Sequence, residues 1–296
     1  MKESKKLFIT ILLAAGLLTA VAATENAGRA VLGISPHEKE ITVTAVTADG
    51  SPVQVEGCTV TEFPSGEETV LTVTGTKVVL KGVLIELVCY ANKLTALDVR
   101  GLTALQELYC QDNMLTSLDI RELTGLHMLY CGNNRLTALD IRGLTALQKL
   151  YCQDNKITSL DVRELIGLRT LFCNDNRLTA LNVRRLTALQ ELDCSSNAIA
   201  SIDVRGLTGL HTLYCHDNRL TSLDVQGLTA LQELTCSDNQ LTALNVQGLP
   251  ALQALGFQNN RLEEDALIRI LNSLPDRKTD EGAETAFLTG DATQGG

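Results

Sequence analysis

Hydrophobic positions recur with a fixed period of 21 residues across the central part of the chain. One copy of the unit reads Leu105-Gln-Glu-Leu108-Tyr-Cys110-Gln-Asp-Asn113 and continues through Leu115, Leu118 and Ile120 to Leu123. The unit is written nine times between residues 84 and 262. Each copy carries seven apolar positions, which one copy cannot bury alone. The pattern therefore predicts a stack of similar rungs that share one continuous core.

Each unit contains one short segment with alternating polarity. In the segment around Leu108 and Cys110, those two residues face inward and their neighbours face outward, as in a β-strand. The asparagine that follows, Asn113 in this copy, closes the turn because its short amide can bond free backbone groups. The spacing L-x-x-L-x-C-x-x-N-x-L at this period is typical of a leucine-rich repeat. The predicted fold class is a curved leucine-rich-repeat solenoid with a parallel β-sheet on its concave face.

The segments outside the repeats predict an export signal and two caps. Residues 1–23 have a basic start, an apolar run and Ala20-Val21-Ala22, which is typical of a signal peptide. No cysteine follows the cleavage region and no second long apolar run exists, so we expect a secreted or cell-surface protein without membrane insertion. Further along we expect a flexible mature N-terminus (24–38), a β-rich N-terminal cap (39–83), a C-terminal helical cap (263–275) and a polar tail (276–296).

Charge and cysteine spacing exclude several function classes. The net charge is −10, which disfavours nucleic acid and anionic lipid as partners. Eight of the nine cysteines recur at the repeat period, on strands too evenly spaced to favour one disulfide pairing. We interpret them as free, buried thiols that fill the core. No metal site or cofactor is expected, and His37, His127, His211 and His216 form no cluster with a nucleophile, so no enzyme is predicted.

The concave face is predicted to carry the partner site. The strand position between leucine and cysteine holds mostly aromatic residues, and tyrosine combines apolar area with a polar tip. An acidic row precedes the recurring asparagine. The candidate partner-binding residues are Tyr90, Tyr109, Tyr130, Tyr151, Phe172, Asp193, Tyr214, Asp112, Asp154, Asp175 and Asp217. Two structural alternatives stay open: repeat duplication copied a tyrosine that only stiffens the sheet, and the aspartates serve the turn.

The unit L-x-x-L-x-C-x-x-N-x-L-T-x-L-D-V resembles the 21-residue cysteine-bearing repeats of the internalin J-like family of bacterial surface proteins. The resemblance covers residues 84–262 and implies an exported adhesion protein that uses its concave face. Here Leu102 stands where the family commonly has a second asparagine, and the LPxTG wall-sorting signal is missing. The resemblance therefore implies a binding surface without naming its partner.

These observations lead to one function hypothesis and two alternatives. The hypothesis is a protein-binding or adhesion module whose partner is a protein or peptide, from a host cell or a bacterial surface. One alternative is a glycan-binding module, because tyrosine beside Asp and Asn suits sugar rings and hydroxyls. The other is a structural component of the cell envelope with no specific ligand.

Overall fold

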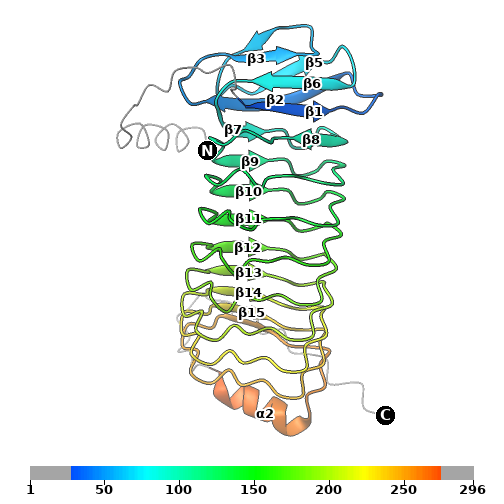
Figure 1. Ribbon diagram of the computed structural model, residues 1–296. Helices are drawn as coiled ribbons and strands as arrows, with labels where there is room; N and C mark the ends of the chain where they lie inside the picture. The colour runs from blue at the N-terminus through cyan, green and yellow to red at the C-terminus, as the bar shows by residue number, and fades with distance from the viewer. Residues whose placement is uncertain (1–27, 275–296) are drawn as a thin grey trace, which may run out of the picture.

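The computed structural model describes residues 28–274, which form a tall stack of rungs between a strand-rich end and a short helix (Figure 1). The predicted signal peptide and the polar tail at 276–296 lie outside the described residues. Nine short parallel strands run up the stack, one per rung. They are β7 (Leu84–Val88), β9 (Glu107–Tyr109), β10 (Met128–Tyr130), β11 (Lys149–Tyr151), β12 (Thr170–Phe172), β13 (Glu191–Asp193), β14 (Thr212–Tyr214), β15 (Glu233–Thr235) and β16 (Ala254–Gly256).

The strands pair in register, so equivalent residues of successive repeats lie side by side. Leu108 pairs with Leu129, and Leu129 pairs with Leu150. These leucines are fully buried, as are the inward cysteines, for example Cys110 and Cys152. All nine cysteines are free thiols. The predicted leucine-rich-repeat solenoid with its inward Leu and Cys positions is therefore confirmed.

The recurring asparagine bonds four backbone groups on two rungs. The side-chain amide of Asn155 donates to the carbonyls of Cys131 (3.0 Å), Cys152 (3.2 Å) and Gln153 (3.2 Å), and its Oδ1 accepts from the Leu136 N–H (2.9 Å). Because these groups are buried in a turn, no neighbouring strand can satisfy them. Each asparagine thus joins its own rung to the preceding one.

The N-terminal end consists of a small sheet and an extension of the solenoid sheet. The small sheet contains β1 (Arg29–Gly33), β3 (Val53–Glu56), β4 (Glu62–Phe63), β6 (Lys77–Lys81) and β8 (Ala96–Asp98), while β2 (Glu40–Thr47) and β5 (Thr69–Thr72) extend the solenoid sheet beyond β7. Asn92 has no preceding rung, and it exchanges two hydrogen bonds with the backbone of Thr42 on β2 instead. Strand β2 therefore replaces the missing rung.

The prediction of a flexible segment at 24–38 is wrong for residues 29–33. These residues form β1, which pairs antiparallel with both β6 and β8. Ala30 and Leu32 are fully buried. The segment is too short and too rich in small residues for the alternation of buried and exposed positions to be recognised in the sequence. Its strand conformation depends on pairing with β6 and β8, which lie about 50 and 70 residues further along the chain. Residues 24–27 lie outside the described part of the chain.

The last rung is covered by α2 (Glu264–Ser273). Ala266 and Ile270 are its buried residues, while Leu271 is 55% exposed. Leu267 and Leu274 pack partly against the core. The helix has the apolar face needed to shield the leucines of the final repeat from water. Among residues 28–274, no helix has the length and apolar character needed to cross a bilayer.

Candidate partner-binding face

The outward residues of the nine parallel strands form one surface, which we call the sheet face. The last residue of each strand lies in one register line, which runs from Val88 through Tyr109 to Gly256. The structure therefore brings six of the predicted residues into one row, namely Tyr109, Tyr130, Tyr151, Phe172, Asp193 and Tyr214. In-register parallel pairing places equivalent residues side by side and so forms this row. Neighbouring members lie about 4.8 Å apart, the spacing of the strands.

Four aromatic rings of the row touch one another. The ring centroids of Tyr109 and Tyr130 are 4.8 Å apart, and those of Tyr130 and Tyr151 are 4.2 Å apart, with interplanar angles of 20° and 11°. Phe172 meets Tyr151 edge-on, with centroids 5.0 Å apart. We call these four residues the aromatic stack. Their side chains are half-buried, and the three tyrosine rings face one another along the stack.

Carboxylates flank the aromatic stack. The Tyr109 hydroxyl donates to Glu107 Oε2 at 2.7 Å. Burial, and then this hydrogen bond, raise the pKa of Tyr109 well above its ordinary value. Burial and the neighbouring Tyr151 raise the pKa of Tyr130 as well. Tyr109 and Tyr130 are therefore neutral donors at physiological pH.

Tyr214 stands apart from the aromatic stack. Asp193 separates it from Phe172 in the register. Its hydroxyl donates to the Glu233 carboxylate, which is the main cause of a pKa raised to about 12. Within residues 28–274, no aromatic contact is recorded for this ring. Asp193 itself accepts two hydrogen bonds from Ser195, from the N–H at 3.0 Å and from Oγ at 2.6 Å.

The acidic row has a backbone reason for its residue type. The four predicted aspartates have left-handed φ values of 50° to 58°, a conformation that Asp and Asn tolerate better than most residues. They are Asp112, Asp154, Asp175 and Asp217. Burial, and then the charges of Asp175 and Asp112, raise the pKa of Asp154, so these carboxylates interact along one edge, although Asn133 and Ser196 interrupt the row. The left-handed backbone supports the alternative that these aspartates serve the turn. Their carboxylates also make this edge of the sheet face acidic.

Tyr90 is not part of the row. It follows β7 rather than lying in it, and its side chain is 45% exposed. It borders a shallow cavity of about 260 Å³, lined in part by Thr42, Thr44 and Val88. The predicted residue therefore faces the joint between the N-terminal cap and the first rung.

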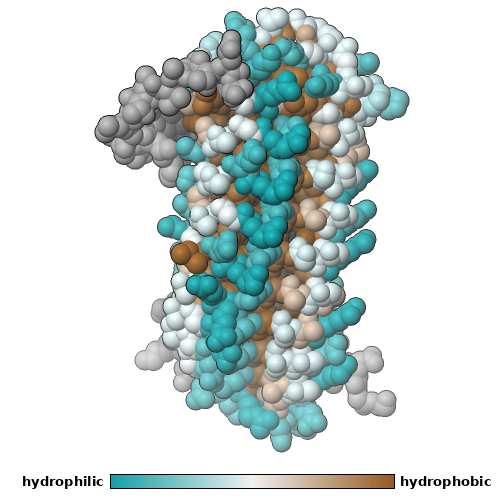
Figure 2. Space-filling model, in the orientation of Figure 1, coloured by the Kyte–Doolittle hydropathy of each residue, from teal (hydrophilic) through white to brown (hydrophobic). Residues whose placement is uncertain are grey.

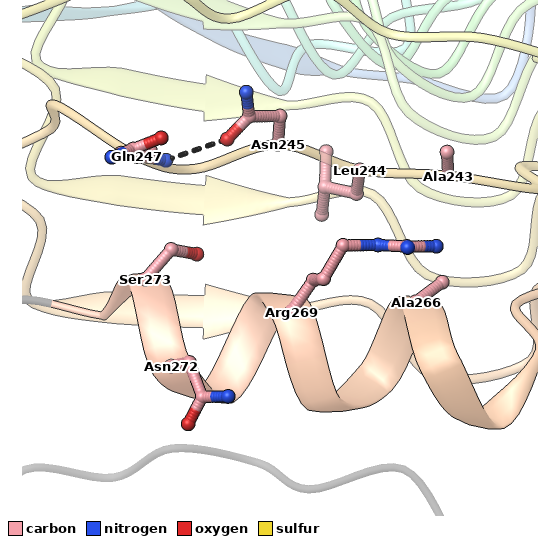
Figure 3. A pocket seen from close by; sticks show the side chains of 8 residues that line it. All are labelled: Ala243, Leu244, Asn245, Gln247, Ala266, Arg269, Asn272 and Ser273. Atoms are coloured by element: carbon pink, nitrogen blue, oxygen red, sulfur yellow. Dashed lines mark hydrogen bonds between the residues drawn. The ribbon is translucent and has the colours of Figure 1, made fainter.

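A second cavity, of about 510 Å³, lies at the other end of the molecule. It separates α2 from the segment Ala243–Gln247 of the rung before it (Figure 3). Arg269 extends from the helix toward Leu244, and the Gln247 N–H donates to Asn245 Oδ1 at 3.0 Å. Arg269 is the one charged group of the lining, and the other polar side chains are those of Asn245, Gln247, Asn272 and Ser273. In the part of the chain that the structure describes, no group of three or more His, Cys, Asp or Glu is arranged to hold a metal ion.

Two rows of cations run along the stack. The first row, which we call the convex arginines, comprises Arg100, Arg121, Arg142, Arg163, Arg184 and Arg205. Most of them pair with the aspartate two residues earlier in their own rung, such as Arg142 with Asp140 at 2.8 Å. Arg184 follows Asn182 instead of an aspartate and reaches Asp203 of the next rung at 3.6 Å. The second row directly follows the recurring asparagine. It consists of Lys93, Arg135, Lys156, Arg177, Arg219 and Arg261, and the 21-residue spacing of these residues was the available signal.

Known proteins resemble this chain in its repeats. A family model described as Leucine Rich repeats (2 copies) matches residues 103–144, 145–185 and 187–230. No curated protein matches the sequence. Among solved structures, the functional domain of InlJ from Listeria monocytogenes, which includes a cysteine ladder, is 35% identical with a TM-score of 0.51, over 62% of this chain and 46% of that one.

Two further structures share the fold. A leucine-rich-repeat protein from Leptospira interrogans is 31% identical with a TM-score of 0.58, over 64% of this chain and 53% of that one. The ectodomain of the plant receptor kinase GASSHO1/SCHENGEN3 from Arabidopsis thaliana, in complex with CASPARIAN STRIP INTEGRITY FACTOR 2, is 27% identical with a TM-score of 0.51, over 57% and 24%. The chain thus spans about half the length of the two bacterial structures it matches.

Proposed function

Because this chain is an internalin-like leucine-rich-repeat protein, we propose that it is an exported binding module that holds a protein or peptide partner on its sheet face. Solenoids of this kind are extended scaffolds for recognition. The observation that carries the proposal is the aromatic stack of Tyr109, Tyr130, Tyr151 and Phe172 at the middle of the face. Export rests on the sequence of residues 1–23.

The stack offers a preorganised anchor. Each ring is fixed by its neighbours at 4.2 to 5.0 Å, so a partner that covers the ring edges orders few additional side chains. Tyrosine is enriched among the residues that dominate binding energy at protein interfaces. Four rungs span roughly 15 Å along the stack. This length suits an extended peptide or the edge of a loop.

The charges around the stack favour a basic partner. Glu107 and Glu191 lie beside it on the strands, and Asp112, Asp154 and Asp175 lie along its edge, whereas Lys149 is the one cation in the flanking strand row. Opposite charges would steer a cationic partner toward this face and fix its register. Association should therefore slow as the salt concentration rises.

Stacking also favours a protein over a glycan. Sugar rings bind tyrosine by covering an open ring face, and the faces between Tyr109, Tyr130 and Tyr151 are occupied by neighbouring rings. Tyr214 is the exception, because no aromatic neighbour is recorded for it in the described chain. A glycan partner would therefore depend on Tyr214, and a protein partner on the stack.

A pull-down from host-cell and bacterial surface extracts tests the proposal. The mature protein is compared with Tyr130→Ala/Tyr151→Ala, with Tyr90→Ala as a control that removes an exposed tyrosine outside the row. We expect the double variant to lose the captured protein and the control to retain it. Thermal unfolding verifies that the double variant is folded.

Three outcomes contradict the proposal in different ways. Equal capture by all variants removes the stack from the interface. Loss with Tyr214→Ala, together with saturable binding on a glycan array that salt does not weaken, indicates a glycan-binding module. No capture by any variant indicates a structural component of the envelope.

A further inference from the structure

In the row of cations that follows the recurring asparagine, Lys93 pairs with Glu38 at 2.7 Å, whereas the cations of the central rungs form no ion pair in the described chain. Arg135, Lys156 and Arg177 are exposed and lie on three consecutive rungs. Within residues 28–274, no ion pair or side-chain hydrogen bond is recorded for these three or for Arg219. We call Arg135, Lys156, Arg177 and Arg219 the basic flank. Five of the six convex arginines, in contrast, are held by an aspartate two residues earlier.

The backbone fixes the spacing of the basic flank. The N–H of Lys156 donates to the carbonyl of Leu136 on the preceding rung at 2.8 Å, and the N–H of Arg177 donates to that of Ile157 at 2.9 Å. The residue after each cation is buried, as Leu136 is after Arg135 and Ile157 is after Lys156. The cation before it therefore points outward. The cations therefore project from adjacent rungs at the strand spacing of about 4.8 Å.

Hydroxyl groups accompany the cations. Thr137, Thr158 and Thr179 lie two residues after the three consecutive cations and are exposed beyond the buried apolar residue. A hydroxyl donor thus repeats beside each positive charge. Figure 2 shows that hydrophilic side chains gather in columns along the length of the stack, as this register requires.

From this arrangement we infer that the basic flank binds an acidic polysaccharide, a linear chain of sugars that carries about one sulfate or carboxylate per ring. A sugar ring is comparable in length with the rung spacing, so successive anions meet successive cations. The threonines supply donors and acceptors for ring hydroxyls. This site lies on different residues from the sheet face, and it does not depend on the proposed function.

Nucleic acid fits the same flank less well. Proteins that bind single strands interleave aromatic side chains with cations, and the basic flank contains no aromatic residue. The chain carries a net charge of −10, and Asp154 and Asp175 lie two residues before Lys156 and Arg177. An acidic polysaccharide would meet the same repulsion, so the missing aromatic residues, and not the charge, separate the two kinds of polymer.

Heparin serves as the probe, with neutral dextran and single-stranded oligo-dT for comparison. Binding is measured by titration calorimetry at low and physiological salt. The test variant is Arg135→Gln/Lys156→Gln/Arg177→Gln. The control is Arg121→Gln/Arg142→Gln/Arg163→Gln, which changes the net charge equally on neighbouring rungs but removes cations that are already paired.

We expect the wild-type protein to bind heparin in a salt-sensitive manner and to ignore dextran. The test variant should lose about tenfold or more in affinity, since three exposed ionic contacts are removed together, while the control changes by less than about threefold. Absence of heparin binding, or equal losses in both variants, overturns the inference. Tighter binding of oligo-dT than of heparin overturns the assignment to polysaccharide.

Discussion

Raising the pH from 8 to 9.5 is expected to destabilise the solenoid through its buried thiols. Burial raises the pKa of the eight ladder cysteines from an ordinary value of 9.0, to about 12 for Cys89, Cys152, Cys194 and Cys236. A raised folded-state pKa means that the unfolded chain releases protons first. Stability is therefore complete below pH 9 and is lost progressively as the pH rises toward 12.

The size of the effect follows from the number of thiols. A thiol that is ionised in the unfolded chain and protonated in the folded protein lowers the free energy of unfolding by about 1.4 kcal/mol for each pH unit. At pH 9.5 about three quarters of the unfolded thiols are ionised, so eight thiols together remove about 6 kcal/mol relative to pH 8. Tyrosine adds little in this range, because its ordinary pKa is about 10.

Urea unfolding under reducing conditions, followed by circular dichroism, measures this loss. The variant Cys131→Ala/Cys152→Ala/Cys173→Ala removes three of the eight thiols, and its loss over the same pH range should fall to about 4 kcal/mol. Cys58→Ala removes a half-buried thiol outside the ladder and should leave the pH dependence nearly unchanged. A stability that is flat from pH 8 to 9.5, or a slope that the triple substitution leaves unaltered, would refute the reasoning.

Three other predictions follow from single side chains. Asn155→Ala leaves one buried N–H and three carbonyls without this hydrogen-bond partner and should cost about 3–5 kcal/mol in urea unfolding; a loss below about 1 kcal/mol would contradict it. The Arg142 guanidinium lowers the pKa of Asp140 to about 2, so this pair's contribution is present above pH 4 and lost as the pH falls to 2. NMR titration of Arg142→Gln should show the Asp140 midpoint near 4. Glu233→Gln should lower the raised pKa of Tyr214 toward 10, so that ultraviolet absorbance at the highest pH at which both proteins stay folded shows more ionised tyrosine in the variant; equal ionisation would rule out the hydrogen bond as the cause.

The candidate site was predictable to the extent that it follows the repeat. Because a parallel sheet places equivalent residues in one line, the row from Tyr109 to Tyr214 could be read from the 21-residue period. The period does not tell which rings touch. Side-chain torsion and neighbouring charges decided that three tyrosines stack while Tyr214 bonds Glu233. The left-handed φ of Asp112 and its equivalents is likewise a property of the folded turn.

By itself, the sequence determined the rung, its inward leucines and cysteines, and the asparagine turn, because contacts in a solenoid link each repeat to the next and the period records them. Tertiary structure alone decided how the ends are closed. Residues 29–33 became a strand through pairing with β6 and β8, and β2 supplied to Asn92 the backbone groups of a missing rung. It also decided that five of the six convex arginines pair within their rungs, that Arg184 reaches the next rung, and that the basic flank stays unpaired. These contacts join segments with no fixed spacing, and a periodic pattern carries no record of them.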